Sequence, residues 1–497
     1  MALSLASLLS ESARFYPQRT ATVLGEAKTT YASLWAQARN VAAALRERGI
    51  QAGDRVALLM PNCDDFPRAY YAILALGAVV VPVHALLTPA EIAYVLEDSE
   101  AKLLIGHPVL AAGREGAALR GIPYAEASDL AGDGSAITVV DRDADDDAVI
   151  LYTSGTTGKP KGAVLSNLNM VMNATVSARD LLFLTPESVL LCALPLFHSF
   201  GQSVVMNAAF RAGASVVLMP RFDGAAALDL MIRESVTIFE GVPTMYVALL
   251  EAAKNDARRP PLKHMMSGGA PLPMALLEQV EATFGVAVEE GYGLSETSPV
   301  ATFNQRIIGT KAGTVGTPVW GVDVQIANAD IDDRIELLPP GERGEIVIRG
   351  HNVFSRYLNK PEATAAAKID GWFRSGDIGT VDEDGFIAIL DRKKDMILRG
   401  GFNVYPREVE EALLRHPAVA QAQVIGIPHE VHGEEVMAVI VLAEDARETT
   451  KAEQIVEWAR DNMARHKYPR EVAFVESYPL GPSGKVLKRE LVSRFMR

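Results

Sequence analysis

The chain has 497 residues, of which 49% are hydrophobic and 22% are charged, and its formal net charge is −14. This apolar share allows a sizeable core and excludes a generally disordered chain, and the acidic balance excludes a nucleic-acid binder that relies on a basic face. At roughly 150 residues per domain, the length predicts about three domain-sized units.

Strands and helices alternate through the first half of the chain. Thr88-Pro89-Ala90-Glu91 is a capping box with proline at the first helical position, so a helix should begin at Pro89. Such alternation predicts parallel sheets covered by helices. The predicted strands are Arg55–Met60, Val79–Val83, Lys102–Ile105, Ser188–Cys192, Ser215–Met219 and Thr237–Glu240, and the predicted helices are Tyr31–Arg48, Phe66–Leu76, Pro89–Ser99, Gly224–Glu234 and Thr244–Lys254.

The second half of the chain has a different pattern. Short strands with glycine-rich turns predict a small β-rich unit, with strands at Gly313–Val319, Val322–Ile326, Gly344–Arg349 and Gly385–Leu390. The last part predicts a small α/β unit, with helices at Pro406–Arg415 and Lys451–Met463 and strands at Ala420–Ile427 and Val436–Val441. The charge cluster at Asp391–Lys394 marks the expected boundary, which gives domains of residues 1–391 and 392–497.

Several functional classes find no support in the sequence. Cys63 and Cys192 lie far apart without a CxxC motif, which predicts two buried thiols in a reducing, cytoplasmic setting. No HExxH motif is present, and His429-Glu430-Val431-His432 is interpreted as a solvated turn rather than a metal site. Residues 69–87 carry no charge, but Gly77 and Pro82 interrupt them, so we expect a helix, a turn and a buried strand instead of a membrane span. We expect no signal peptide. The sequence contains no GxSxG motif, which a serine hydrolase of the nucleophile-elbow type would need.

Residues 152–162 read YTSGTTGKPKG, a small, polar and cationic loop after an apolar run. Backbone N–H groups in such a loop bind phosphate oxygens, hydroxyls add donors, and lysines offset negative charge. It is not a Walker A loop, because two residues separate Gly155 from Gly158 and Pro160 follows Lys159. Taken alone, the loop fits either a phosphate site or a flexible surface turn.

The loop resembles the phosphate loop of the adenylate-forming superfamily, which includes acyl-CoA ligases, peptide-synthetase adenylation domains and luciferases. Six further stretches resemble the family in its own order, so the resemblance covers essentially the whole chain. It implies an α/β fold, with a large N-terminal domain of two α/β subdomains plus a small β-rich subdomain, and a small mobile α+β C-terminal domain. The stretches are LPLFHSFG (194–201), SGGAPL (267–272), EGYGLSET (290–297), WFRSGDIG (372–379), DRKKDMILRGGFNVYPREVE (391–410) and PSGKVLKREL (482–491).

The resemblance implies an ATP site with magnesium. Glu296 matches the magnesium ligand with help from Thr156 or Thr157, Tyr292 would stack on adenine, and Asp377 would take both ribose hydroxyls. Taken alone, these three would be a surface acid, a core aromatic and a turn acid. The full set of implied ATP and CoA contacts is Thr153, Ser154, Gly155, Thr156, Thr157, Gly158, Lys161, Gly269, Ala270, Pro271, Tyr292, Ser295, Asp377, Arg392, Gly400 and Gly401.

The resemblance also implies a two-step reaction. Lys485 would stabilise charge as the carboxylate attacks the α-phosphate, giving acyl-AMP and pyrophosphate. The small domain would then rotate about Lys394, so that the Gly400-Gly401 strand forms a tunnel for the pantetheine arm of CoA. Glycine there lets a thin thiol arm pass close to the backbone.

The acid substrate is predicted less sharply. His198, counted with Lys485 and Glu296 among the catalytic residues, stands where peptide synthetases carry an aspartate for the substrate amine, which disfavours an amino acid. The expected pocket is small and apolar, with His198, Val242, Gly268, Gly293 and Leu294. The sequences of the motifs resemble those of bacterial fatty acyl-CoA ligases most, which favours a medium- to long-chain fatty acid as substrate. The alternatives are a ligase for aryl or specialised acids, one that loads a carrier protein, and a non-catalytic nucleotide-binding regulator.

The expected partners are the acid, ATP and CoA, with no nucleic acid and at most a weak association with a membrane surface. The chain is expected to be cytoplasmic and a monomer or homodimer.

Overall fold

A computed structural model describes residues 3–153, 159–479 and 486–495. The chain divides into two compact units. The first comprises Met1–Val324 and Ile348–Phe373, and the second comprises Gln325–Val347 and Arg374–Arg497. The predicted C-terminal domain, residues 392–497, lies wholly inside the second unit, and the boundary at 391/392 remains a prediction.

In the first unit, one sheet is largely parallel and contains seven described strands. Its middle strands are mainly apolar and almost entirely buried, as expected for strands covered on both faces. The strand order is β18 (Arg356–Tyr357), β8 (Lys161–Ser166), β7 (Asp147–Thr153), β4 (Val79–Pro82), β3 (Arg55–Leu59), β5 (Leu103–Gly106) and β6 (Tyr124–Glu126). The helices around it are α2 (Tyr31–Glu47), α3 (Asp65–Ala75), α4 (Pro89–Asp98) and α5 (Ala112–Ala118), with 3₁₀ turns η1 (Ala127–Asp129) and η2 (Gly134–Ala136).

The other sheet of this unit contains nine described strands and joins distant parts of the chain. The N-terminal strand β1 pairs in parallel with β10, almost 200 residues later. The strand order is β15 (Thr317–Pro318), β14 (Val300–Phe303), β13 (Val288–Gly293), β12 (His264–Ser267), β11 (Ile238–Gly241), β9 (Val189–Cys192), β10 (Ser215–Leu218), β1 (Thr20–Leu24) and β2 (Ala27–Thr30).

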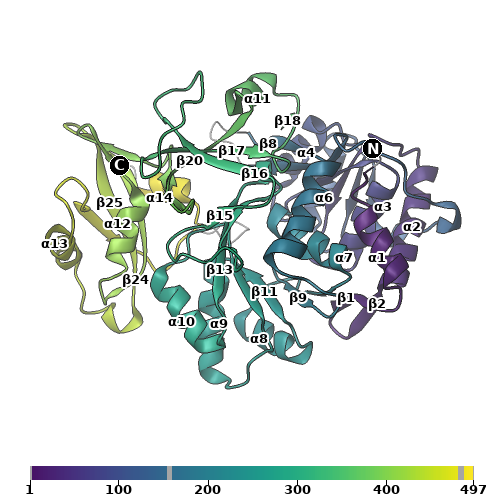
Figure 1. Cartoon of the computed structure of the whole chain (residues 1–497), viewed down its shortest axis with the longest axis horizontal. Helices are drawn as coiled ribbons and strands as arrows, with labels where there is room; N and C mark the ends of the chain where they lie inside the picture. The colour runs from purple at the N-terminus through teal and green to yellow at the C-terminus, as the bar shows by residue number, and fades with distance from the viewer. Residues whose placement is uncertain (1–2, 154–158, 480–485, 496–497) are drawn as a thin grey trace. The chain divides into compact units, whose positions relative to one another are not determined.

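Helices cover the nine-stranded sheet (Figure 1). On one face, Leu191, Phe239 and Met265 pack in one apolar cluster with side chains of α8 (Gly224–Arg233), α9 (Pro243–Asn255) and α10 (Met274–Phe284). A buried π-helical segment, η4 (Phe200–Asn207), contacts β9 and α6. The remaining helical segments are α1 (Ser7–Phe15), α6 (Asn167–Val176), η3 (Ser177–Leu181), α7 (Ala208–Ala212) and the 3₁₀ turn η5 (Ser295–Thr297).

Shorter strands form a third sheet, with the order β16 (Val322–Ala327), β17 (Gly344–Gly350), β20 (Trp372–Val381), β19 (Lys368–Ile369), and β21 (Ile387–Arg392) also pairs with β20. Helix α11 (Pro361–Ala367) precedes β19. The predicted strand Gly313–Val319 is wrong, because only Thr317–Pro318 is extended. Gly313 and Gly316 have positive φ, and a Cβ on Gly316 would lie 2.0 Å from the backbone of Phe303. A close backbone approach therefore replaces the expected pairing.

The C-terminal part of the second unit is an α+β layer. Its sheet has the order β23 (Phe402–Val404), β22 (Ile397–Arg399), β25 (Gly433–Leu442), β24 (Val419–His429), and β26 (Glu471–Phe474) also pairs with β25. One apolar cluster joins the sheet to α12 (Pro406–Leu413) and α13 (Ala452–Asn462), and another joins it to Leu491 of α14 (Lys488–Phe495). The 3₁₀ turn η6 (Glu444–Ala446) follows β25.

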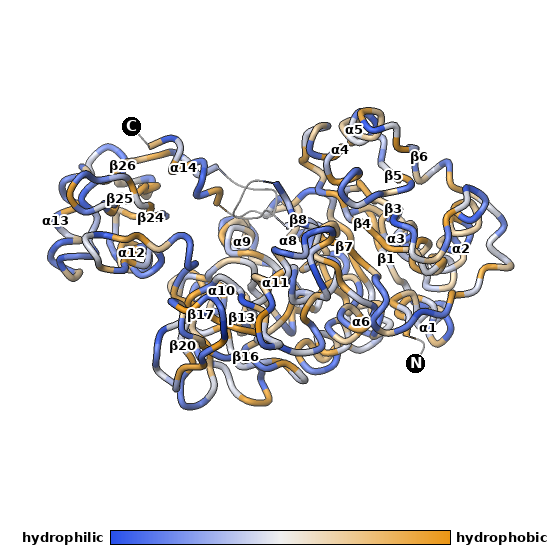
Figure 2. Tube along the Cα trace, turned by 90° about the horizontal axis from the view of Figure 1, so that it is seen from above, coloured by the Kyte–Doolittle hydropathy of each residue, from blue (hydrophilic) through white to orange (hydrophobic). Residues whose placement is uncertain are grey.

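The expected α/β fold class is confirmed, with the remaining predicted helices and strands shifted by a few residues at their ends. The capping box of Thr88 and Glu91 forms as predicted. The uncharged run at 69–87 folds as the end of α3 followed by the buried strand β4, and no helix among the described residues has the length and apolarity to cross a membrane. In Figure 2 the hydrophobic colour gathers on the inner strands β3, β4 and β7.

Candidate active site

The predicted phosphate loop connects two antiparallel strands. Thr153, the last residue of β7, lies opposite Lys161, the first residue of β8. The predicted loop therefore stands between two paired strands, whereas a Walker loop leads from a strand into a helix. Five predicted contacts, Ser154, Gly155, Thr156, Thr157 and Gly158, lie outside the described residues.

Glu296 lies at the described end of this loop. Its side chain comes from η5, is 8% exposed, and accepts hydrogen bonds on Oε1 from Thr153 Oγ1 at 3.2 Å and from Tyr357 Oη at 2.9 Å. The backbone carbonyl of Glu296 also accepts a hydrogen bond from the N–H of Phe354 at 2.8 Å. Two hydroxyls thus hold a buried carboxylate beside the strand that leads into the loop.

Cationic groups lie at the other side of the loop. Lys161 Nζ is 5.2 Å from the ring centre of Tyr357, and Lys159 Nζ is 5.1 Å from the ring centre of Tyr94. Magnesium prefers one or two carboxylates together with phosphate oxygens, and lysine ammonium groups bind phosphate as point charges. The described residues here fit a metal–polyphosphate group.

Tyr357 is a site residue that the sequence did not reveal. It belongs to β18, which pairs with β8 beside the loop. Burial and the neighbouring Glu296 carboxylate raise the pKa of its hydroxyl, which therefore stays protonated and donates to Glu296. No motif marks Tyr357, because its role depends on a strand pairing between segments almost 200 residues apart.

The predicted adenine contacts lie along one edge of the nine-stranded sheet. Gly269-Ala270-Pro271 follows β12, and Tyr292 is on the neighbouring strand β13, 9% exposed. The N–H of Leu272 donates to Glu290 Oε1 at 3.3 Å, which ties the loop to β13. Ser295 begins the turn η5 that carries Glu296.

The predicted acyl-site residues lie at the same edge of the sheet. Val242 follows β11 and is 4% exposed, and Gly268 follows β12, where a Cβ would lie 3.0 Å from the Phe200 ring. A Cβ on Gly293 would lie 1.7 Å from the carbonyl oxygen of Pro299, so only glycine fits there. Leu294 is the residue before η5, and its N–H donates to Thr297 Oγ1 at 2.8 Å. His198 precedes η4, and its Nδ1 accepts a hydrogen bond from the N–H of Phe200 at 3.3 Å.

A buried asparagine that the sequence analysis missed holds the segment that carries His198. Asn62 Nδ2 donates to the carbonyls of Cys192 at 3.0 Å and Leu194 at 2.9 Å, and its Oδ1 accepts from the N–H of Leu196 at 2.9 Å. These partners lie more than 100 residues along the chain. One amide therefore fixes the backbone on the way from β9 to His198.

In the second unit, two predicted nucleotide contacts pair directly. Asp377 on β20 lies opposite Arg392 on β21, and Arg392 Nε is 3.3 Å from Asp377 Oδ1. Asp377 is 5% exposed. Burial and the nearby charge of Arg392 lower the pKa of Lys394, the predicted hinge residue, below its usual range.

The Gly400-Gly401 segment is a turn, which corrects the expectation of a strand. Both residues have positive φ, of 56° and 84°, and they connect β22 to β23 with Arg399 opposite Phe402. Two consecutive left-handed residues are the requirement of a tight two-residue hairpin. No atom of the described residues lies within 4 Å of a Cβ on Gly401.

Lys485, the predicted catalytic lysine, lies outside the described residues. Three residues later, Lys488 Nζ donates to Glu410 Oε1 at 2.8 Å and so ties α14 to α12. The nearby carboxylates of Glu410 and Asp391 outweigh burial and raise the pKa of Lys488. This second lysine of the PSGKVLKREL stretch therefore has a structural ion pair.

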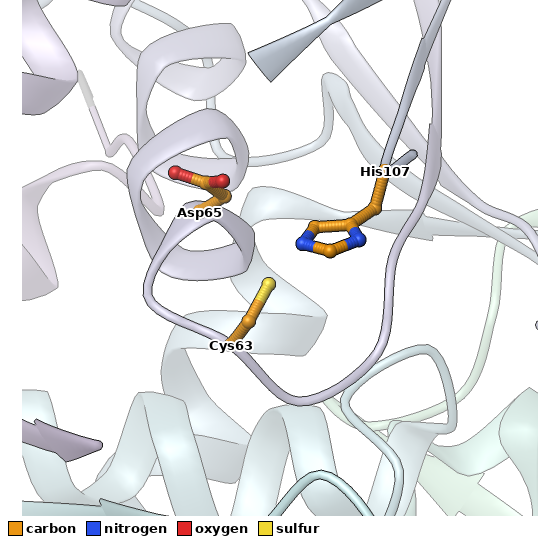
Figure 3. Close-up of side chains that lie close together, drawn as sticks. All are labelled: Cys63, Asp65 and His107. Carbon is orange, nitrogen blue, oxygen red and sulfur yellow. The ribbon is translucent and has the colours of Figure 1, made fainter. Parts of the chain in front are cut away.

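Three potential metal ligands also meet away from these residues, namely Cys63, Asp65 and His107 (Figure 3). They follow the neighbouring strands β3 and β5. Burial raises the pKa of the Cys63 thiol to about 11, which keeps it protonated at neutral pH, and Arg68 Nη1 pairs with Asp65 at 2.7 Å. Because the Asp65 carboxylate already has a cationic partner, we assign no metal to these residues. Cys63 and Cys192 are both buried and free, as expected.

The predicted turn at residues 429–432 joins β24 to β25, and its Val431 side chain is 79% exposed. His429 and His432 stack with ring centres 4.8 Å apart.

Comparison with known proteins identifies the family of the chain. Residues 9–358 match the AMP-binding enzyme family, and residues 408–485 match the AMP-binding enzyme C-terminal domain. The chain is 38% identical to a feruloyl-CoA synthase of Amycolatopsis sp, covering 97% of each chain. It is 34% identical to a long-chain-fatty-acid–CoA ligase of Bacillus subtilis, covering 98% of this chain and 94% of that one.

The structure of one relative contains bound ATP and magnesium. The o-succinylbenzoate coenzyme A synthetase of Bacillus subtilis, in complex with ATP and magnesium ion, superposes with a TM-score of 0.87 at 31% identity, covering 98% of this chain and 99% of that one. Relatives of this class bind ATP with magnesium and use CoA as co-substrate. The chain therefore belongs to the AMP-binding enzyme family of the adenylate-forming superfamily, as an AMP-forming acyl-CoA synthetase.

Proposed function

We propose that this acyl-CoA synthetase activates a carboxylic acid with an apolar body, and that Thr153, Lys161 and Glu296 hold the phosphates of ATP together with magnesium. The observation that carries the proposal is the buried Glu296 carboxylate, which accepts hydrogen bonds from both Thr153 and Tyr357. Magnesium there would neutralise charge on the phosphate oxygens.

The reaction runs in two steps. A carboxylate oxygen attacks the α-phosphorus of ATP, and the bond from this phosphorus to the oxygen that bridges to the β-phosphate breaks. The products are acyl-AMP and pyrophosphate. The thiolate of CoA then attacks the acyl carbon, the carbon–sulfur bond forms, and AMP leaves. We assign the first step to Lys485, because a fixed cation near the attacked phosphate stabilises the developing charge.

We propose that the second unit supplies the remaining nucleotide contacts. Asp377 takes the ribose hydroxyls, since two carboxylate oxygens suit a vicinal diol, and its pairing with Arg392 supports this role. Residues 392–497 form a domain that rotates about Lys394 between the two steps. The Gly400-Gly401 turn then lies along the path of the pantetheine arm, and the enzyme acts in the cytoplasm.

Two classes of acid are candidates. A fatty acid is supported by the apolar residues Val242 and Leu294 and by the long-chain-fatty-acid–CoA ligases among the relatives. An aryl acid is supported by the feruloyl-CoA synthase and o-succinylbenzoate synthetase relatives. In either case burial of apolar groups provides affinity, at roughly 0.8 kcal/mol per methylene.

A pyrophosphate-release panel tests the proposal. The purified enzyme is given ATP, magnesium and fatty acids from short to long chains or aryl acids, each with and without CoA. We expect acid-dependent pyrophosphate release, with acyl-CoA formed only when CoA is present. Release that does not depend on any acid, or full activity in Glu296→Gln, would contradict the proposed site.

A further inference from the structure

One buried acid near the predicted acyl site has no hydrogen-bond partner among the residues that the structure describes. Glu240 lies on β11 and is 1% exposed, and neither of its carboxyl oxygens has a hydrogen-bond partner within residues 3–153, 159–479 and 486–495. Buried carboxyl groups are almost always paired or hydrogen-bonded, because desolvation without a partner is strongly unfavourable. Burial raises the pKa of Glu240 to about 8. An unpartnered acid of this kind points to a ligand that supplies the missing hydrogen bond.

Strand register places Glu240 on the same face of the sheet as the predicted acyl-site residues, two positions earlier along the strand. Alternate residues of a strand share a face, so Glu240 and Val242 point the same way. Glu240 pairs with Met266 on β12, and Gly268 is two residues beyond Met266 on that same face. With about 3.3 Å per residue, Glu240 lies about 7 Å deeper along the strands than Val242 and Gly268.

The opposite face of the strand is closed to a ligand. Phe239, the preceding residue, is fully buried in the apolar cluster with α8, α9 and α10. Glu240 therefore faces the other side of the sheet, together with Cys192 on β9 and Met266 on β12. Segment η4, which begins with Phe200, packs against β9. An acid that enters beside Gly268 would thus meet apolar side chains along its body and a carboxyl group at its inner end.

Aromatic rings pack against two glycines near Glu240. A Cβ on Gly268 would lie 3.0 Å from the Phe200 ring, and one on Gly291 would lie 2.9 Å from the Phe303 ring and 3.1 Å from Met266. Phe200 and Phe303 therefore add aromatic side chains beside Glu240, and such rings favour an aromatic group over an aliphatic chain. A fatty acid would also place its methyl end against Glu240 and leave the carboxyl group without a partner.

We propose that Glu240 forms a polar subsite at the inner end of the acyl site, where it binds a hydroxyl group on the substrate. The substrate class is then an aromatic carboxylic acid with a hydroxyl on the ring, far from the carboxylate. This inference rests on the proposed acyl-CoA synthetase function and selects the aryl candidate over the fatty one. A site built to hydrogen-bond a hydroxyl rejects the analogue that lacks it far more strongly than a hydrophobic pocket rejects a size change.

The test compares matched acids in the full-length enzyme. Pyrophosphate release is measured with 4-hydroxycinnamate, cinnamate and dodecanoate for the wild type, Glu240→Leu and Glu240→Gln. We expect the wild type to prefer 4-hydroxycinnamate over cinnamate by about 100-fold or more in kcat/KM. Glu240→Leu should reduce that preference to a few-fold, with a gain on cinnamate, and Glu240→Gln should keep a large part of it.

Ser267→Ala provides the matched control, because Ser267 is also buried without a hydrogen-bond partner among the described residues but lies on the other face of β12. This variant should keep the wild-type preference. A wild type that uses cinnamate or dodecanoate as well as 4-hydroxycinnamate overturns the subsite alone, and this comparison needs no variant to fold. Equal preference in the wild type and Glu240→Leu also overturns it. Absence of pyrophosphate release with every acid instead overturns the proposed function.

Discussion

The hydroxyl of Tyr357 donates a hydrogen bond to Oε1 of Glu296 at 2.9 Å, across 61 residues of chain. Thr153, at the end of β7, donates to the same oxygen. The proposed metal ligand is therefore oriented before ATP binds, by one residue of a recognised motif and one residue outside every motif.

Removal of the Tyr357 hydroxyl should weaken magnesium use. Residues that orient a metal ligand commonly change metal affinity 10–100-fold, so we expect Tyr357→Phe to raise the magnesium concentration for half-maximal pyrophosphate release by about 10-fold or more. The measurement is a magnesium titration at saturating ATP and acid. Tyr478→Phe is the control, because its buried hydroxyl donates only to the carbonyl of Val439 in a region without a proposed metal ligand. An identical shift in both variants would contradict the orienting role.

Lys485 should separate the two half-reactions. We expect Lys485→Ala to abolish acyl-AMP formation, because the cation that stabilises charge at the attacked phosphate is lost. Formation of the thioester from supplied acyl-AMP and CoA should remain near the wild-type rate. The rates of acyl-AMP formation and of thioester formation are measured in separate assays. An equal loss of both rates would contradict the assignment of Lys485 to the first step.

A bulky residue at the Gly401 turn should produce the reverse pattern. Gly401→Leu should retain pyrophosphate release and lose most thioester formation, because the side chain would enter the expected path of the pantetheine arm. Gly401 has a φ of 84°, so any side chain strains the backbone. Gly401→Ala carries the same strain with little bulk and is therefore the control. Collapse of pyrophosphate release in the leucine variant would refute the tunnel.

The buried carboxyl of Glu240 should make stability depend on pH. The unfolded chain releases this proton near a pKa of 4.5, and the folded chain holds it up to about 8. Between these values the folded state binds more protons, so a rise in pH lowers the free energy of unfolding, by up to about 1.4 kcal/mol per pH unit. Urea denaturation of the enzyme without ligands, from pH 5 to 9, should show a shallower slope in Glu240→Gln than in the wild type. Equal slopes would mean that Glu240 is ionised or solvated in the folded chain.

Loss of the Asn62 amide should loosen the segment that carries His198. Asn62→Ala removes the amide donor to the carbonyls of Cys192, Leu194 and Met219 and takes the side-chain acceptor from the N–H of Leu196, and a buried polar group left unpaired costs about 1–3 kcal/mol. We expect the free energy of unfolding to fall by at least about 2 kcal/mol and the KM for the acid to rise more than the KM for ATP. Equal changes in both KM values would indicate a general loss of structure.

Local patterns accounted for much of the fold. The capping box at Thr88, the apolar run of β4 and the helix over α9 depend on residues close together in the sequence, and all formed within a few residues of expectation. The two errors have different causes: close approach of another strand at one position, and a local turn at the other. Gly316 lies against Phe303, and Gly400-Gly401 turns β22 into β23.

The sequence by itself determined the class of chemistry. The hydroxyl- and glycine-rich loop and the stretches around Glu296 and Asp377 are contiguous motifs, because each predicted set of contacts lies within one short segment of the chain. These motifs can therefore be recognised from the amino-acid sequence without a structure.

Only the tertiary structure decided which distant side chains meet. The hydrogen bond from Tyr357 to Glu296, the side-chain hydrogen bonds of Asn62 and the unpartnered state of Glu240 among the described residues all depend on strand order and register. A buried polar group gains or loses its partner through segments that are far apart in the chain, and no local pattern encodes that distance. Substrate choice is expected to depend on Glu240, a residue that sequence alone would have left among the core positions of a strand.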